Sequence, residues 1–390
     1  MPPPAALMEP GAAPPATLSD RWFARRNRLL ASPAFQRWAS GFPLTRWIAR
    51  RRARAVFDLV AGFVYSQVLQ ACVQLDLFNL LADGPLPIEP IARRVNLTDD
   101  AARRLLDAAV SLQLVERRPG GRYGLGVLGA PLVGNAGIAA MVTHHTALYA
   151  DLRDPLALLR GEVGSAALAG YWPYAEAELR GQSSAVEAAR VADYSALMSA
   201  SQPLVATEIL DAYPLGRHRC LLDVGGGEGT FVSAVAARAP HLQLRVFDLP
   251  AVAERARARF AAQGLAARAQ AHGGDFLRDP LPRGADIATL VRVVHDHDDR
   301  EAMALLRAVR AALPDDGVLL LAEPMSDTPG AEPMGDAYFG FYLLAMGRGR
   351  PRRAEELTGM LREAGFGRVQ ALTNRMPMQT RVLLAHCRKP

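Results

Sequence analysis

The part of the chain that follows residue 216 alternates between two patterns of hydrophobic positions. Short apolar runs are typical of buried strands, and apolar residues at every third or fourth position are typical of helices. Such segments alternate here, which predicts a doubly wound α/β sheet covered on both faces. The expected strands are 220–227, 242–250, 267–277, 285–295, 317–325, 367–374 and 380–387, and the expected helices are 229–240, 250–264, 298–314 and 352–366.

The pattern ahead of residue 215 is mainly helical. An apolar segment with helical spacing covers 55–84, and 85–126 then divides into a short helix, a turn at Asn96, a second helix opened by Thr98 and a hairpin across 119–121. Helix, turn, helix and hairpin predict a winged helix. The second helix carries three aspartates beside two arginines, a poor face for DNA phosphates. We therefore expect a packing and dimerisation role.

Further helices are expected across 135–200, where Met, Tyr, Trp and His are frequent. These side chains suit the wall of an apolar ligand pocket, and ordinary core packing explains any one of them equally well. At 390 residues the chain is long for one domain. We expect a disordered tail over 1–20, an arm over 21–54, a winged-helix domain with substrate-lining helices over 55–180, and an α/β ligand-binding domain over 181–390.

The cysteines and the chain start bear on the cellular compartment. Cys72, Cys220 and Cys387 are far apart in sequence and fit neither a disulfide framework nor a metal motif, which favours a reducing compartment. No apolar run approaches the roughly 20 uncharged residues that a membrane-spanning helix needs. The start of the chain lacks the basic and apolar regions of a signal peptide. We expect a cytoplasmic protein.

Residues 21–54 carry the whole positive excess of the chain. They hold ten arginines and no acid, while the net charge of the chain is +6. Arginine among tryptophan and phenylalanine suits an anionic membrane surface, and a helical arm that packs on a partner subunit would show the same composition. Both interpretations stay open, and binding to nucleic acid is not expected. The aromatic residues are Trp22, Phe23, Phe35, Trp38, Phe42 and Trp47.

A glycine-rich turn follows the first strand of the α/β part. Gly225, Gly227 and Gly229 form Gly-x-Gly-x-Gly in LLDVGGGEGTF, which differs from the dinucleotide fingerprint Gly-x-Gly-x-x-Gly. Glycine permits close backbone approach to a ligand, although a tight strand–helix turn also favours it. Asp223 lies just before the glycines, where it can meet a cationic amine or hold the loop.

Two further acids stand at strand ends, where ligands bind in such sheets. Asp248 ends the second strand, and a carboxylate there can accept both ribose hydroxyls. Asp275 ends the third strand and can accept the adenine amine, while Phe276 can cover the adenine ring. A nucleoside ligand without a phosphate cradle is predicted, and S-adenosylmethionine fits better than a nicotinamide dinucleotide. Each acid taken alone is also explained as a turn or helix cap.

The motifs LLDVGGGEGTF, FDLP, GGDFL, VRVVHDHDD, LAEPM and EAGF together resemble the S-adenosylmethionine-dependent O-methyltransferases of the hydroxyindole and caffeate type. The resemblance covers 55–390 and implies a winged-helix dimerisation domain followed by a Rossmann-like class I methyltransferase domain. Segments 31–78 and 145–161 are also similar to the carotenoid O-methyltransferases of purple phototrophic bacteria. Those enzymes methylate the tertiary hydroxyl of hydroxylated acyclic carotenoids.

The resemblance implies a role for several residues. His295 takes the position of the family's general base, and Glu323 that of the glutamate that orients the imidazole. Asp296 is expected to support His295 locally. Arg292 and Leu249 are expected to frame the cofactor pocket, although a surface position explains Arg292 as well.

The chain departs from the family pattern at two positions. His297 replaces the tryptophan of His-Asp-Trp, and Pro351 stands where many members have a second glutamate. A clamp of two glutamates around the base is therefore in doubt. The run HDHDD at 295–299 is not expected to bind a metal, because alternate residues of an extended segment point to opposite sides. Asp298 or Asp299 is well placed to cap the following helix.

These inferences predict a methyltransferase that acts on a hydroxylated acyclic carotenoid, a homodimer, and peripheral contact with the inner or photosynthetic membrane. A tertiary alcohol is a far weaker acid than a phenol, whose pKa is about 10, so we expect proton removal to be concerted with methyl transfer. Two alternatives stay open. One is a methyltransferase for a phenolic or polyketide metabolite, and the other is a winged-helix regulator that senses S-adenosylmethionine.

Overall fold

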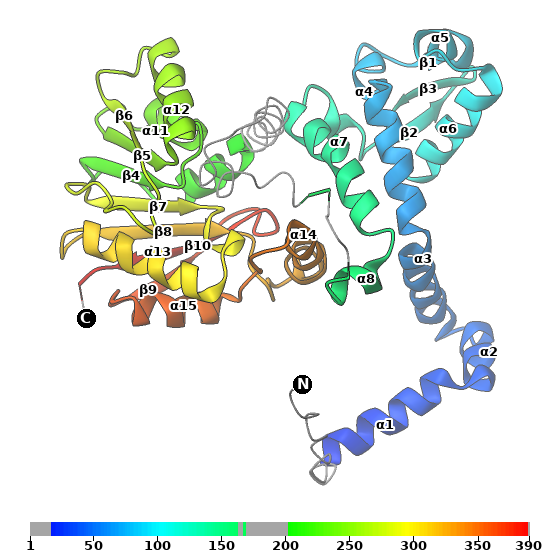
Figure 1. The fold of residues 1–390 in the computed structure, drawn as a ribbon. Coiled ribbons are helices and arrows are strands. Elements are labelled where there is room, and N and C mark those ends of the chain that lie inside the picture. The colour runs from blue at the N-terminus through cyan, green and yellow to red at the C-terminus, as the bar shows by residue number, and fades with distance from the viewer. Residues whose placement is uncertain (1–16, 163–166, 169–201, 389–390) are drawn as a thin grey trace, which may run out of the picture.

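A computed structural model describes residues 17–162, 167–168 and 202–388 (Figure 1). A helical part built around the long helix α3 and a part built around a seven-stranded sheet lie side by side, and the chain enters through a helical arm. The helices expected within 169–201 lie outside the described residues.

All seven expected strands form and join one sheet in the order β6-β5-β4-β7-β8-β10-β9. The first five strands of this order are parallel, while β10 runs antiparallel to both of its neighbours. The chain reverses its direction across the sheet between β4 and β7, which is where such sheets bind ligands. The strands are β4 (Cys220–Val224), β5 (Gln243–Asp248), β6 (Ala269–Gly273), β7 (Ile287–Val291), β8 (Val318–Glu323), β9 (Val369–Leu372) and β10 (Arg381–His386).

The four expected helices also form and cover the two faces of the sheet. One apolar core packs Leu305 and Leu357 against β7 and β8, and the other packs Val232 and Phe260 against β4 and β5. Strand β7 lies between them with all its residues buried, which explains why its sequence is apolar except for Thr289. The helices are α11 (Thr230–Arg238), α12 (Pro250–Ala262), α13 (Asp299–Ala312) and α15 (Ala354–Glu363).

One pair of helical segments had no counterpart in the sequence analysis. A π-helix, η4 (Pro333–Phe339), runs directly into α14 (Gly340–Met346). These segments pack against α7 (Ala136–Asp151) and α8 (Pro155–Leu159) of the helical part. They therefore connect the two halves of the molecule next to the switch point of the sheet.

The helical part contains the expected helices and hairpin. Helix α6 begins after Thr98, whose side chain accepts a hydrogen bond from the amide of Ala101. The predicted helix over 55–84 needs correction, because the chain turns at Asp76, where φ is +52°. The elements are α3 (Arg46–Gln74), α4 (Leu77–Leu80), β1 (Leu86–Pro87), α5 (Ile88–Arg94), α6 (Asp99–Ser111), β2 (Val115–Arg118) and β3 (Arg122–Leu125), and the strands form a sheet in the order β1-β3-β2.

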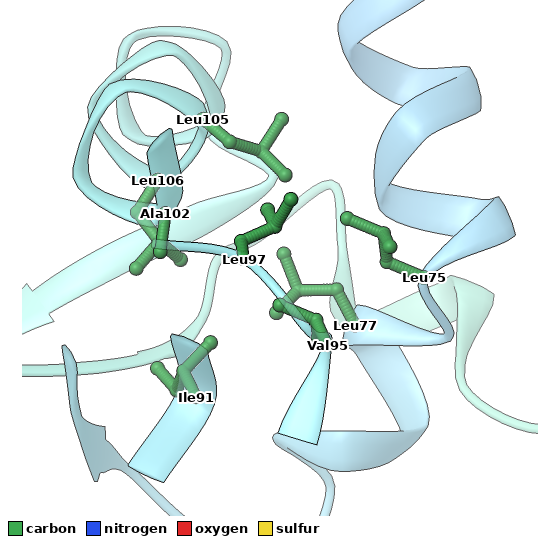
Figure 2. A pocket seen from close by; sticks show the side chains of 8 residues that line it. All are labelled: Leu75, Leu77, Ile91, Val95, Leu97, Ala102, Leu105 and Leu106. Carbon is green, nitrogen blue, oxygen red and sulfur yellow. The ribbon is translucent and has the colours of Figure 1, made fainter. Parts of the chain in front are cut away.

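A small hollow lies inside the helical part, between the end of α3 and helices α5 and α6 (Figure 2). Its lining includes Leu75, Ile91 and Leu105, and all eight lining side chains are apolar. Such a lining offers no partner for a nucleoside or a hydroxyl group. The hollow belongs to the core of this part and not to a reaction site.

The arm consists of α1 (Leu18–Ala31), α2 (Pro33–Gly41) and the first turns of α3. Helix α1 begins at Leu18, so the last residues of the expected disordered tail are helical, and the rest of that tail lies outside the described residues. By length and composition α3 is able to cross a membrane, which corrects the expectation that no segment approaches this. Its last turns, however, pack in an apolar core where Cys72 is fully buried.

Candidate active site

The turn after β4 contains four glycines, of which Gly225, Gly227 and Gly229 have positive φ. A Cβ atom on Gly225 would lie 2.8 Å from the Val293 side chain, and one on Gly229 would lie 2.5 Å from the ring of Phe260. A Cβ atom on Gly227 would meet nothing within 4 Å. Gly225 and Gly229 are therefore required for packing, while Gly227 faces open space in which a ligand can approach the backbone.

Asp223, at the end of β4, is a buried acid with one unpaired oxygen. The Thr289 hydroxyl donates to its Oδ1 at 2.6 Å, while Oδ2 has no hydrogen-bond partner among the described residues. Burial raises the pKa of Asp223 to about 7; the bond from Thr289 opposes this rise and the charge of Asp248 adds to it. A cationic group of a ligand would offset the free-energy cost of the buried carboxylate and would supply the missing hydrogen bond to Oδ2.

Asp248 joins the ends of β4 and β5. Its Oδ2 accepts from the amide of Gly227 at 2.7 Å, and its Oδ1 accepts from the amide of Leu249 at 2.8 Å. The structure therefore brings Asp248, Leu249 and the glycine turn together, and their contacts with a cofactor remain a prediction.

Asp275 and Phe276 follow β6 at the same edge of the sheet. Asp275 accepts from the amide of Leu277 at 2.9 Å and lies 3.4 Å from Arg278, so it also stabilises its own turn. The ring of Phe276 packs edge-on against His297, with 5.2 Å between the ring centres. The expected contacts of Asp275 and Phe276 with an adenine remain predictions.

His295 lies in a single 3₁₀ turn, η3 (Val294–Asp296), just beyond the end of β7, and only 6% of the residue is exposed. Its Nε2 lies 3.2 Å from Asp296 Oδ1, and its Nδ1 lies 3.5 Å from Glu323 Oε2. Glu323 Oε2 also accepts from the His295 amide at 3.1 Å. Asp296 and Glu323 are thus two carboxylates that lie within 3.5 Å of the imidazole.

The two carboxylates decide the charge of this imidazole. Burial by itself lowers the pKa of His295, but Asp296 and then Glu323 outweigh it and raise the pKa to about 9. Glu323 Oε1 is fully buried and has no hydrogen-bond partner among the described residues. His295 is therefore a stronger base than an ordinary histidine, and it is mainly charged at neutral pH.

The rest of the run at 295–299 has separate roles. His297 lies 3.2 Å from Glu301, away from the carboxylates of His295, and the Asp298 side chain caps α13 by accepting from the Glu301 amide at 2.8 Å. Asp299 accepts from the guanidinium groups of Arg350 and Arg352. Within the described ranges, no cluster of three or more potential metal ligands is present.

Three arginines make contacts near the ends of β4 and β7. Arg292 follows β7 with φ of +60°, and its amide donates to the carbonyl of Ala322 at 2.8 Å. Glu228, within the glycine turn, forms ion pairs of 3.0 Å with both Arg255 and Arg259 of α12. No local signal in the sequence marks Glu228, because its partners lie on a helix about thirty positions away.

An aromatic wall faces His295 from η4 and α14. The ring of Phe339 lies 6.0 Å from that of His295, between centres. The neighbouring Tyr338 bonds His145 of α7 at 2.8 Å, and Tyr342 bonds His144 at 2.9 Å. The tyrosine hydroxyls are thus paired with imidazoles, and burial raises the pKa of Tyr338 to about 12. The wall is apolar in character apart from these paired tips.

The residues at the switch point suit S-adenosylmethionine. The unpaired Asp223 Oδ2 matches a cationic amino group, Asp248 matches ribose hydroxyls, and the open space at Gly227 admits a ligand to the backbone. When bound, this cofactor supplies a methyl group on a positively charged sulfur. His295 stands at the adjacent strand end, where it can take a proton from an acceptor hydroxyl.

Comparison with protein families agrees with this arrangement. The O-methyltransferase domain matches residues 149–367, and the O-methyltransferase dimerisation domain matches 57–135. A demethylspheroidene O-methyltransferase of Cereibacter sphaeroides is 42% identical over 90% of this chain and 91% of its own length. Another from Rhodobacter capsulatus is 39% identical over 97% and 92%, and the acetylserotonin O-methyltransferase of Mus musculus is 33% identical over 84% and 87%.

Solved structures show the same fold. Human N-acetylserotonin methyltransferase in complex with S-adenosylmethionine has a TM-score of 0.66 at 24% identity, over 87% of this chain and 98% of its own. The methyltransferase SibL reaches a TM-score of 0.72 at 24% identity, over 86% and 99%. From its family matches, relatives and fold, the chain belongs to the S-adenosylmethionine-dependent O-methyltransferases with an N-terminal dimerisation domain.

Proposed function

We propose that this enzyme transfers the methyl group of S-adenosylmethionine to the tertiary hydroxyl of a hydroxylated acyclic carotenoid, with His295 as the general base. The oxygen–methyl bond forms as the sulfur–methyl bond breaks, and the hydroxyl proton passes to His295. The relatives named demethylspheroidene O-methyltransferases, which are 42% and 39% identical over nearly their full lengths, support this choice of substrate.

The observation that carries the proposal is the position of His295 between Asp296 and Glu323. Two carboxylates stabilise the imidazolium that forms when the proton arrives. Their effect matters more for an alcohol than for a phenol, because an alcohol gives up its proton less readily. A buried histidine of raised pKa therefore favours an aliphatic hydroxyl as the acceptor.

The aromatic wall supports a hydrocarbon acceptor. A long carotenoid chain offers no hydrogen bonds except at its hydroxyl group, so unpaired polar groups along its pocket would lose hydration without compensation. The hydroxyls of Tyr338 and Tyr342 already bond imidazoles of α7, and Phe339 stands next to the base. In this arrangement His295 and its carboxylates form the polar end of an otherwise apolar surface.

We assign the cofactor to the turn after β4 and to the acids beyond it. Asp223 would pair with the amino group, and Asp248 with the ribose hydroxyls. The adenine would lie beside Asp275, with Phe276 at its face. Contacts around this pocket would come from Gly225, Gly227, Leu249 and Arg292.

Methyl transfer from labelled S-adenosylmethionine tests the substrate. Purified enzyme is offered hydroxylated acyclic carotenoids in liposomes, and simple phenols in parallel. We expect label in the carotenoid ether and little in the phenols. Transfer to phenols alone would favour the phenolic alternative, and an enzyme that binds S-adenosylmethionine without transferring it to any acceptor would favour the regulator.

We also propose that the arm contacts an anionic membrane, where such a substrate resides. Trp22, Trp38 and Trp47 are 60%, 52% and 61% exposed among ten arginines without an acid. The match with the Rhodobacter capsulatus relative covers 97% of the chain and so includes most of the arm, which lies ahead of the dimerisation-domain match at 57–135.

A deletion of 17–45 removes α1, α2 and five of the ten arginines of the arm and leaves α3 complete. We expect the shortened enzyme to bind vesicles that contain phosphatidylserine more weakly, in flotation assays, while its affinity for S-adenosylmethionine stays within about twofold. Unchanged vesicle binding would instead indicate a structural arm.

The exposed apolar side chains of α3 suit a second copy of this chain, which supports a homodimer through the dimerisation domain. Sedimentation velocity of the full chain and of the 17–45 deletion tests this assignment. We expect both to sediment as dimers. The side chains are Val56, Phe57, Leu59, Val60, Phe63 and Val64.

A further inference from the structure

The segment 349–352 lies directly on the backbone of the loop that carries His295. Gly349 has φ of +75°, and a Cβ atom there would collide with the carbonyl oxygen of His295 and with the backbone of Asp296. The amide of Arg350 donates to that His295 carbonyl at 2.9 Å. No side chain fits between the two segments, so the position of one determines that of the other.

Arg352 is the central residue of this contact and is fully buried. Its Nη1 donates to the carbonyl of Val294 at 2.8 Å, and its Nη2 donates to the carbonyl of His297 at 2.8 Å. Its Nε and Nη2 both reach Asp299 Oδ1, at 2.9 and 2.8 Å. One guanidinium therefore bonds the residues on both sides of His295 and the first residue of α13.

The loop needs such a partner because it has little regular structure of its own. The single turn η3 leaves most of its carbonyl groups without helical hydrogen bonds. A buried carbonyl without a partner is costly, and a planar guanidinium can bond several acceptors in one fixed geometry. The imidazole of His295 keeps its place between Asp296 and Glu323 only while this backbone stays where it is.

We propose that Arg352 is a positioning residue for methyl transfer, which holds His295 in register with Asp296 and Glu323 from behind the loop. The proposal rests on His295 being the general base. Arg352 does not touch the acceptor or the cofactor in this assignment. It acts through the backbone, where a displacement of about 1 Å is able to cost about 100-fold in rate.

Two variants test the proposal. Arg352→Lys keeps the charge, but one ammonium nitrogen cannot bond both carbonyls and the carboxylate at their present spacing. Asp299→Asn removes the counter-ion of Arg352. The Asp299 side chain is 60% exposed, so we expect this variant to fold even if Arg352→Lys does not. Arg307→Lys is the control. Arg307 lies elsewhere on α13 and makes an exposed ion pair of 2.8 Å with Glu363 of α15.

Three measurements apply to each variant. Turnover is expected to fall about 10- to 100-fold in Arg352→Lys and about 3- to 10-fold in Asp299→Asn, with the KM for S-adenosylmethionine within about twofold. In ¹⁵N-histidine NMR, the His295 pKa of Arg352→Lys should fall toward the ordinary value. Since the lysine keeps the charge, this fall reports the displaced imidazole. Arg307→Lys should change none of these three quantities.

The outcomes separate this proposal from the proposed function. An unchanged turnover in Asp299→Asn together with an unchanged His295 pKa in Arg352→Lys would overturn the positioning role. If Arg352→Lys does not fold, unchanged turnover in Asp299→Asn is by itself enough to overturn the positioning role. Full activity in His295→Gln would instead overturn the general base, whatever the arginine variants show.

Discussion

The charge of the proposed general base can be shifted by a single isosteric substitution, Asp296→Asn. Asp296 lies 3.2 Å from His295 Nε2 and is the largest of the influences that raise the pKa of this histidine. The asparagine keeps the shape but removes the negative charge. Burial, which opposes the charged imidazole, then acts against Glu323 alone, and we expect the His295 pKa to fall to the neighbourhood of its ordinary 6.5 or below.

The size of the effect follows from the two pKa values. A rise from 6.5 to about 9 corresponds to about 3 kcal/mol of preference for the charged form. At pH 7 this leaves about 1% of His295 neutral, compared with about 75% for a histidine of pKa 6.5. The base must be neutral to take a proton, so activity rises with pH through its pKa. The wild-type kcat/KM should therefore climb tenfold per pH unit and level off near pH 9.

The pH dependence of kcat/KM, which reports the free enzyme, measures this shift. Asp296→Asn should level off about two pH units lower, at a reduced maximum because its imidazole is a weaker base. Asp315→Asn is the control, since Asp315 is exposed and pairs with Arg310 outside the site. A wild-type profile that levels off below pH 7.5, or a midpoint that does not move in Asp296→Asn, would refute the reasoning.

Three further substitutions test the cofactor site and the wall. Asp223→Asn should weaken S-adenosylmethionine binding at least tenfold in calorimetry because the amino group loses its anion; equal affinity would disprove that role. Gly229→Ala should lower the unfolding free energy by about 2–4 kcal/mol, because position 229 has positive φ and the added Cβ clashes with Phe260. The control Gly359→Ala lies in open space on α15 and should not destabilise the protein. Equal melting temperatures of the two variants would contradict this. Tyr338→Phe should leave the carotenoid KM within about twofold but lower the unfolding free energy by about 1 kcal/mol, since the partly buried imidazole of His145 on α7 loses its partner. A large KM increase would mean that the hydroxyl binds the acceptor.

Local patterns in the sequence predicted most of the fold. The strands are short apolar runs and the four helices that flank them have clear apolar stripes, so each element is marked within its own residues. The strand ends then predicted which side chains meet, because parallel strands bring Asp223, Asp248 and Asp275 to one edge of the sheet. The same kind of local signal narrowed the helix cap to Asp298 or Asp299, and the structure shows that it is Asp298.

The sequence did not predict η4 and α14, because Pro333 and several glycines obscure their helical pattern. Their place depends on contacts with α7, such as the hydrogen bond between Tyr338 of η4 and His145 of α7, which are 193 positions apart in sequence. No local rule couples residues at such a distance, and only the packed structure brings them together.

The state of the base was also decided by tertiary structure. The sequence placed His295 and Glu323 at neighbouring strand ends, but the raised pKa depends on burial, on the Nε2 contact with Asp296 and on the depth of the site. Arg352 reads in sequence as one arginine of a basic pair. It becomes a buried support for the loop only because the sheet brings 349–352 against 294–299, since hydrogen bonds and charges depend on distances in space and not on spacing along the chain.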